Sequence, residues 1–444
     1  MTTSTDDRLL SLFPSLHVLR AARLAADPKK MLLGGVGLLV LVFGELLLGL
    51  LPFAPQGELA IDTATRLVAA PEGLRDIAGE GSWLDRLRVE QGAGLLLAPL
   101  RSVIEPGLVI FQNGNSWSDI AWAWTRLIWA LIVWSFFGGA ICRMCAMQFA
   151  QHERVSPIKA LSFAKAQLQN FLVAPFLPLA GILVLLACNA LLGLVASLLP
   201  GIAVPVLAIV WGLVLFSAFL MAMMLVGLGT GWPLMIAAVS TEDSDGFDGL
   251  SRSFGFLTDR PAYAATLALV AAPVFVFGWC VVSLMVALTF SLGQWAVQAG
   301  SAGADIDQAV RSENVVVVSN QETRLRRTTH VWAIEPFWID LREHDGEANG
   351  LIWFDPSRTP ESDVGFSGRA ILCWNAVLLL MLAGYGPSFF WSATTVGYFL
   401  LRQSDDGTAL DQVADYGVIP TSSEEPAAVS KPAEADAGAT VGSE

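Results

Sequence analysis

The chain has 444 residues, a formal net charge of −14 and a mean hydropathy of +0.57. Apolar residues make up 54% of it and charged residues only 15%, whereas about 25% is usual in soluble globular proteins. This composition excludes an ordinary soluble protein, a disordered chain and a nucleic-acid binder, which needs a basic face. The sequence therefore predicts an integral membrane protein.

Residues 1–30 are expected to form a cytoplasmic amphipathic segment. The bases Arg20 and Arg23 fall on one helical face, and Lys29 and Lys30 come directly before the first apolar run. Basic amphipathic helices lie in the headgroup plane of anionic membranes. These four residues are therefore candidate ligands of lipid headgroups, and simple packing under the bundle is the alternative.

Six apolar stretches reach the roughly 20 residues that a bilayer span needs. They are residues 31–53, 120–142, 171–199, 202–228, 262–292 and 370–401. The predicted fold is an all-α membrane bundle of about six transmembrane helices, with residues 31–292 as its main part and 370–402 as the last helix. Within that last helix, Gly384-Tyr385-Gly386-Pro387 leaves open whether there is one span or a broken pair.

Two long segments between spans are expected to face outward. In the first, residues 54–119, the apolar run Gly94–Ile104 is too short to span and should lie on the outer membrane face or pack on the bundle. The second, residues 293–369, is predicted to be a small extracytoplasmic α+β segment. Its expected strands are rich in β-branched residues and cover 315–318, 328–334 and 350–354.

Two further amphipathic helices are predicted on the cytoplasmic side. Ser156 is a predicted N-cap, followed by an apolar stripe of Ile158, Leu161, Ala164 and Leu168. Lys159 and Lys165 lie off that stripe and are further headgroup candidates. A second stripe contains Phe247, Leu250, Phe254 and Leu257. An amphipathic helix thus precedes the first, third and fifth spans.

The distribution of Lys and Arg near the span ends predicts the orientation. It places both termini in the cytoplasm and the protein, as a multi-pass chain, in the cell inner membrane. The acidic charge is concentrated in residues 403–444, which carry nine acids and a single base, Lys431. The composition of this tail is typical of a disordered cytoplasmic segment.

Charges inside spans are the default functional candidates in a membrane protein. Glu45 and Arg126 lie about 12 and 9 Å below the outer ends of their spans at 1.5 Å per residue, so their depths match. With Asn189 and Asn375 they are predicted to form a polar cluster in the outer half of the bundle. Such a cluster is either a gated solute site or a buried ion pair that sets helix register, and a single acid and base favour the latter.

Several short motifs resemble a large group of polytopic membrane proteins common in planctomycete-type bacteria. They are Gly138-Gly139-Ala140-Ile141-Cys142-Arg143, Trp232-Pro233-Leu234-Met235, Phe247-Asp248-Gly249-Leu250-Ser251-Arg252-Ser253-Phe254-Gly255-Phe256, Arg260-Pro261, Ser388-Phe389-Phe390-Trp391-Ser392-Ala393 and Asp406-Gly407-Thr408. A looser likeness is to the membrane domain fused to some glycerophosphodiesterases, although the catalytic domain of those enzymes has no counterpart here. The resemblance implies the fold and a membrane location, and it carries no activity over.

The sequence favours a non-enzymatic inner-membrane component that binds membrane lipids or partner membrane proteins. A transporter or permease subunit is the alternative, and a lipid-modifying enzyme is a weaker one, since no G-x-S-x-G, H-E-x-x-H or phosphate-loop motif is present. No catalytic residue, cofactor, metal or nucleic acid is predicted. Cys142 and Cys145 are interpreted as small apolar residues at a helix end rather than as a redox or zinc pair.

Overall fold

The structure is a computed structural model that describes residues 17–52, 54, 89–112, 114–198, 200–300 and 366–413. Within these ranges every regular element is helical, and seven helices are long and apolar enough to cross a membrane. A multi-pass, all-helical membrane protein is thereby confirmed. The strands predicted between residues 315 and 354 lie outside the described residues.

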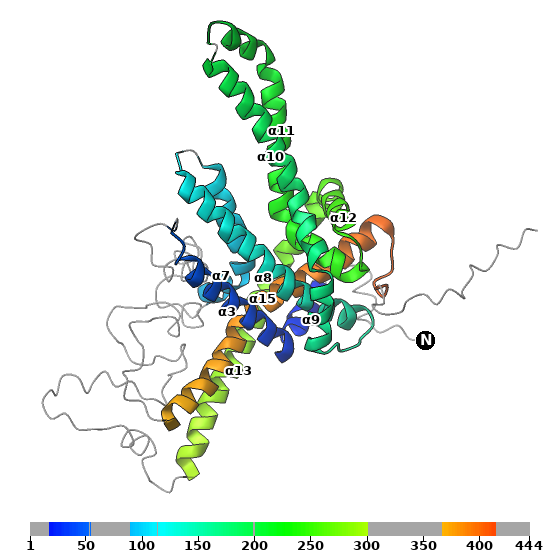
Figure 1. Ribbon diagram of the computed structural model, residues 1–444. Coiled ribbons are helices and arrows are strands. Elements are labelled where there is room, and N and C mark those ends of the chain that lie inside the picture. Colours follow the sequence, from blue (N-terminus) through cyan, green and yellow to red (C-terminus); the bar gives the residue numbers. More distant parts are fainter. Residues whose placement is uncertain are drawn as a thin grey trace, which may run out of the picture.

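Ten helices make up the described structure (Figure 1). The seven candidate spans are α3 (Pro28–Leu48), α7 (Val89–Phe111), α8 (Trp117–Ala150), α10 (Leu168–Leu198), α11 (Pro200–Glu242), α13 (Pro261–Gly300) and α15 (Phe366–Asp406). The three short helices are α2 (Leu19–Ala25), α9 (Pro157–Ala166) and α12 (Gly246–Asp259). Each short helix directly precedes a long one, as the sequence predicts for spans one, three and five.

Helix α7 adds a seventh candidate span to the six predicted ones, and of the two outcomes expected for residues 94–104, packing on the bundle is confirmed. Its central apolar run is too short to span, but the helix extends for 23 residues and packs against α8 and α15. The polar side chains that interrupt its apolar pattern are satisfied locally. Arg101 and Glu105 form an i,i+4 ion pair at 2.9 Å, and Ser102 donates to Pro99 O and accepts from Trp134 Nε1.

Contacts between helix ends establish how the bundle is threaded. Helices α3 and α8 are antiparallel, because Glu45 meets Arg126 at one end and Lys30 meets Gln148 at the other. Helix α7 joins α8 through a short turn and forms an antiparallel hairpin with it, so α3 and α7 run in the same direction. We call the end where α3 begins and α8 ends the basal end, and the opposite end the distal end.

The last long helix also ends at the basal end. It runs parallel to α8, since Gly138 packs on Trp391 and Phe149 lies against Phe399 further along both helices. Arg260, which precedes α13, meets the end of α15 at Asp405 over 3.8 Å. The start of α3 and the end of α15 therefore lie at the same end of the bundle.

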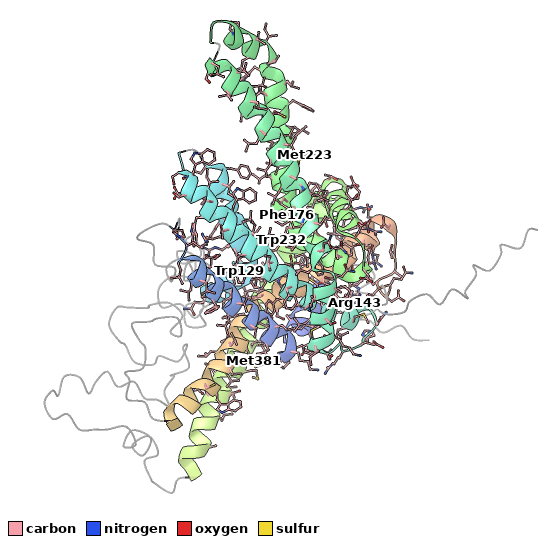
Figure 2. All side chains as sticks on the ribbon, in the orientation of Figure 1. Trp129, Arg143, Phe176, Met223, Trp232 and Met381 are labelled. Atoms are coloured by element: carbon pink, nitrogen blue, oxygen red, sulfur yellow. The ribbon has the colours of Figure 1, made fainter. Side chains whose placement is uncertain are left out.

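The hairpin of α10 and α11 projects away from the crossing of α3, α8 and α15 (Figure 1). Its apolar side chains point outward on all sides, as Met223 does in Figure 2, and Ile209 is 83% exposed. Water would strongly disfavour such a surface, whereas acyl chains would not. At 1.5 Å per residue, α11 is about 65 Å long, well beyond the roughly 30 Å hydrocarbon core.

Helix α15 is continuous through Pro387, which settles the alternative of a broken pair in favour of one helix. The glycines before it serve close packing instead. A Cβ atom on Gly384 would lie 1.8 Å from Met31 O, and one on Gly34 would lie 2.5 Å from Gly384 O. Small residues at such crossings let two backbones approach closely.

The two predicted apolar stripes coincide only in part with the buried faces of the short helices: Ala164 is buried and Leu250 and Phe254 pack against the core, whereas other stripe residues are exposed. Helix α12 buries Gly246, Gly249, Ser253 and Phe256, while Phe247 is 67% exposed. Helix α9 buries Ala160, Phe163 and Ala164, while Ile158 is 81% exposed. The prediction that Ser156 caps α9 is confirmed, since its side chain accepts from Lys159 N.

Candidate functional site at the helix ends

Glu45 and Arg126 form an ion pair near the distal end. Arg126 Nε donates to Glu45 Oε2 at 2.8 Å, and the two side chains are 11% and 1% exposed, respectively. The pair lies beside Trp129, whose indole N–H donates to Leu41 O and whose ring fills the space that the missing side chain of Gly44 leaves. The structure thus brings together the two charges whose depths match in the sequence.

The predicted polar cluster does not extend beyond this pair. Asn189 on α10 exchanges hydrogen bonds with Ser217 on α11, inside the projecting hairpin. Asn375 is half-buried on α15, and in the described part of the chain it makes no hydrogen bond to either charge. The two asparagines are therefore separate from the Glu45–Arg126 pair.

Lys30 corrects another prediction, because it is not available to a lipid headgroup. Its side chain is completely buried, and Nζ donates to Leu24 O at 3.0 Å and to Gln148 Oε1 at 2.7 Å. It thus ties the end of α2 to α8. The other headgroup candidates, Arg20, Arg23, Lys29, Lys159 and Lys165, are all exposed.

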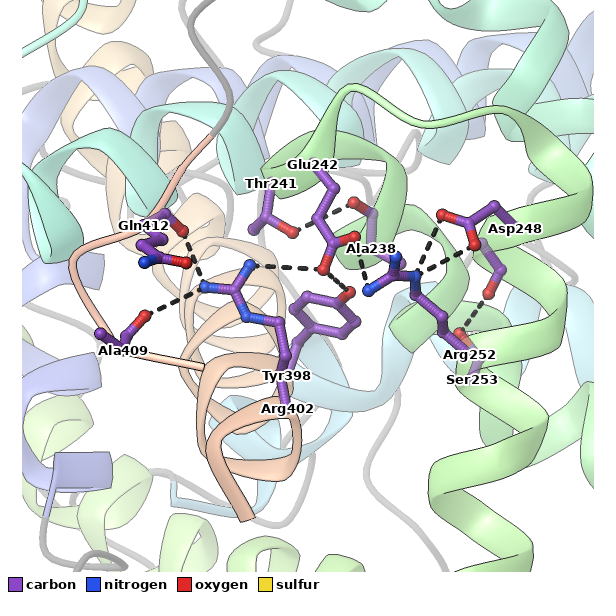
Figure 3. A network of polar contacts seen from close by, with 11 residues as sticks. Ala238, Thr241, Glu242, Asp248, Arg252, Ser253, Tyr398, Arg402, Ala409 and Gln412 are labelled. Atoms are coloured by element: carbon purple, nitrogen blue, oxygen red, sulfur yellow. Dashed lines mark hydrogen bonds and ion pairs between the residues drawn. The ribbon is translucent and has the colours of Figure 1, made fainter. Parts of the chain in front are cut away.

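A second polar cluster lies at the basal end, where α11, α12 and α15 meet (Figure 3). Its centre is Glu242, the last residue of α11. The Tyr398 hydroxyl and Arg402 of α15 both donate to Glu242 Oε1, the latter over 3.3 Å. Arg252 of α12 meets Glu242 Oε2 at 2.8 Å. One carboxylate therefore holds three helices together, and we call this group the Glu242 cluster.

Arg252 and Arg402 extend the Glu242 cluster in opposite directions (Figure 3). Arg252 also pairs with Asp248 one turn earlier on α12, at 3.0 Å. Burial acts to lower the pKa of Arg252, but the Asp248 hydrogen bond and the Glu242 charge outweigh it and raise that pKa. Arg402 donates to Ala409 O at 3.3 Å and to Gln412 O at 2.7 Å.

The two buried cysteines of α8 lie in an environment that is typical of hydrophobic residues. Cys142 and Cys145 are completely buried, and their thiols face Trp391 O at 3.8 Å and Ser392 O at 3.7 Å. Among the residues that the structure describes, no group of three His, Cys, Asp or Glu side chains is placed to hold a metal ion. The Glu45–Arg126 pair and the Glu242 cluster can hold neighbouring helices together through ion pairs and hydrogen bonds.

The motifs that carry the sequence resemblance converge on the basal half of the bundle. Trp232 packs edge to face on Trp391 with ring centroids 5.5 Å apart, and Gly138 leaves room for the same ring. Arg252 belongs to the Glu242 cluster, and Gly407 begins the segment that Arg402 holds, with a φ of +69°. Close packing and ion pairing therefore account for these motif residues.

Sequence reasoning did not find the Glu242 cluster. Its members look ordinary in the sequence: an acid at the end of one span, a tyrosine and an arginine near the end of another, and an arginine on a short helix. Tyr398 and Arg402 are separated from Glu242 by 156 and 160 residues. The only signal in the sequence is an acid and an arginine near the ends of two apolar spans, which are separated by a third span.

Comparison with known proteins adds no relative: neither a family model, nor a curated protein, nor a solved structure matches the chain.

Proposed function

We propose that this protein is a non-enzymatic component of the inner membrane that binds membrane lipids. Partner membrane proteins would bind it either directly or through these lipids. The main support for this proposal is the composition of the basal surface. Arg20, Arg23, Lys29, Lys159 and Lys165 are exposed there. Large apolar side chains are exposed beside them, with Leu19 at 54% and Ile158 at 81%. Bases next to apolar side chains match the headgroup and acyl regions of an anionic membrane.

This proposal includes the orientation of the chain. The basal end carries the exposed bases and both described ends of the chain. Under the positive-inside rule, that end faces the cytoplasm. Both termini are then cytoplasmic, and the likeness to polytopic membrane proteins of planctomycete-type bacteria agrees with an inner-membrane location.

A structural role is preferred over a transporter or permease subunit because the intramembrane polar groups engage one another. Glu45 is bound by Arg126, and Asn189 is bound by Ser217. A transported solute would need polar groups that exchange protein partners for solute along a path. Solute-dependent protection of Glu45 from chemical modification would favour the transporter instead.

The test is native mass spectrometry of the full chain released from detergent with phosphatidylglycerol. Replacing Arg20, Arg23, Lys29, Lys159 and Lys165 with Gln should reduce phosphatidylglycerol binding, by on the order of 1 kcal/mol for each charge near the surface. In the matched control, each Arg is exchanged for Lys and each Lys for Arg, and binding should persist. Equal phosphatidylglycerol binding by the Gln variant and the native chain would refute the proposal.

A further inference from the structure

The basal end carries bases that form no ion pair within the described structure. Arg20, Arg23, Lys29, Lys159 and Lys165 are exposed, and none forms an ion pair with another described residue. In contrast, Arg252, Arg260 and Arg402 each meet a carboxylate within 4 Å. We call these five exposed bases the basic surface.

The chain after α15 is held at the same end of the molecule. Arg402 binds the carbonyl oxygens of Ala409 and Gln412. Leu410 and Val413 pack against the hydrophobic core. The chain therefore leaves the described structure after Val413 from an anchored position.

A series of ring contacts connects this anchor to the start of α2. The guanidinium of Arg402 lies 5.1 Å from the ring of Phe399, and that ring lies 5.3 Å from Phe149. Phe149 meets the ring of His17 edge to face at 6.2 Å. His17 is only two residues before α2, which carries two of the five bases. The exit of the chain therefore lies at the same end of the molecule as α2, which packs against α15.

The residues beyond this exit have the complementary charge. Residues 414–444 contain six acids and one base, a net charge of −5. A chain of these 31 residues can span up to roughly 100 Å, so it can reach every base of the surface. Because it is tethered, its effective concentration at that surface is on the order of millimolar.

We propose that residues 414–444 bind the basic surface within the same molecule and compete there with anionic lipid headgroups. The acidic segment then regulates how strongly the basal end holds anionic lipid. This inference rests on the proposed lipid-binding function, and it assigns a regulator to the same site. Salt and anionic lipid both weaken the intramolecular contact, since each screens or replaces the acidic side chains.

Carbodiimide cross-linking tests the contact directly, because the reagent joins a carboxylate to an amine only when the two are in contact. The full chain is placed in phosphatidylcholine nanodiscs at low salt. We expect peptides of residues 414–444 to be linked to Lys29, Lys159 or Lys165. These links should decrease when phosphatidylglycerol replaces a third of the lipid. No link from this segment to any of the three lysines would overturn the proposal.

Native mass spectrometry with phosphatidylglycerol then measures the competition. In one variant the six acids become amides: Asp415→Asn, Glu424→Gln, Glu425→Gln, Glu434→Gln, Asp436→Asn and Glu444→Gln. If the segment occupies the surface nine-tenths of the time, the apparent Kd of phosphatidylglycerol should fall about tenfold in this variant. In a chain whose five surface bases are already Gln, the same six substitutions should change nothing.

The outcomes distinguish the two proposals. If replacing the five bases does not affect phosphatidylglycerol binding, the proposed function fails. If the bases do bind phosphatidylglycerol but the six acid substitutions leave its Kd unchanged, the lipid-binding function stands and the regulatory role of residues 414–444 is refuted.

Discussion

At the scale of single residues, the buried Glu45–Arg126 pair makes a sharp prediction. Its two charges lie 2.8 Å apart, and neither side chain is more than 11% exposed. Removing one partner leaves the other charge buried without a partner, which costs about 3–5 kcal/mol of stability in buried pairs. Glu45→Gln or Arg126→Gln alone should therefore lower the thermal midpoint in detergent, and the double variant should recover part of the loss. Single losses that simply add would show that the residues are not coupled.

His17 predicts a pH dependence at the start of α2. Burial, and to a lesser extent the charge of Arg20, lower the pKa of His17 from its usual 6.5. The folded state thus binds this proton less well than the unfolded state, so the stabilisation is present above pH 6.5 and is lost as the pH falls below it. The thermal midpoint should fall less between pH 7.5 and 5.5 in His17→Gln than in the native chain. Equal falls would exclude His17 as a contributor.

The sequence predicts contacts between single residues where their position along the helix determines which residues meet. Matched depths were enough to anticipate the neighbours Glu45 and Arg126. Lys30 was misassigned because it was grouped with its neighbour Lys29. Adjacent helical residues point about 100° apart, so Lys29 faces outward while Lys30 faces α8. The partners of Glu242 depend on which helices pack together, and that information is not local in the sequence.

At the scale of helices, the crossing of α3 and α15 is the most sensitive contact. A Cβ atom on Gly384 would meet backbone at 1.8 Å, which no side-chain movement can relieve. We expect Gly384→Ala to separate the two helices and to lower the thermal midpoint in detergent markedly. Gly397→Ala on the same helix is the matched control, because nothing lies within 4 Å of its Cβ position. A Gly384→Ala variant as stable as this control would contradict the close crossing.

Helix positions were more predictable than helix faces. Long apolar runs located six of the seven candidate spans, and the cap of α9 was predicted from Ser156. Helix α7 was missed as a span because the apolar run Gly94–Ile104 alone is too short, whereas the helix continues on both sides of it from Val89 to Phe111. On α12 the pattern of large apolar residues did not reveal that Gly246, Gly249 and Ser253 are buried against the bundle. Close helix packing favours small residues, and the spacing of hydrophobic residues in the sequence does not show where such packing occurs.

At the scale of the whole molecule, the two ends of the bundle differ in chemistry. The basal end gathers the short amphipathic helices, the Glu242 cluster and the exposed bases. From this end the α10–α11 hairpin projects with apolar side chains on its outer surface (Figure 2). This difference agrees with the proposal that the hairpin lies among acyl chains and that the basal end meets lipid headgroups.

The last prediction concerns how this molecule is threaded through the membrane. Because α8 and α15 both end where α3 begins, the start of α3 and the end of α15 lie at one end of the bundle. After the native cysteines are replaced, single cysteines are introduced at three exposed positions: Ser162 and Gln403 at the basal end, and Gln112 at the distal end. In intact cells, an impermeant maleimide should label Gln112→Cys, and it should label Ser162→Cys and Gln403→Cys only after permeabilisation. Labelling of Ser162→Cys and Gln403→Cys from opposite sides would contradict the parallel direction of α8 and α15, whose ends these two positions mark. Labelling of both from outside would preserve that threading and reverse the proposed orientation.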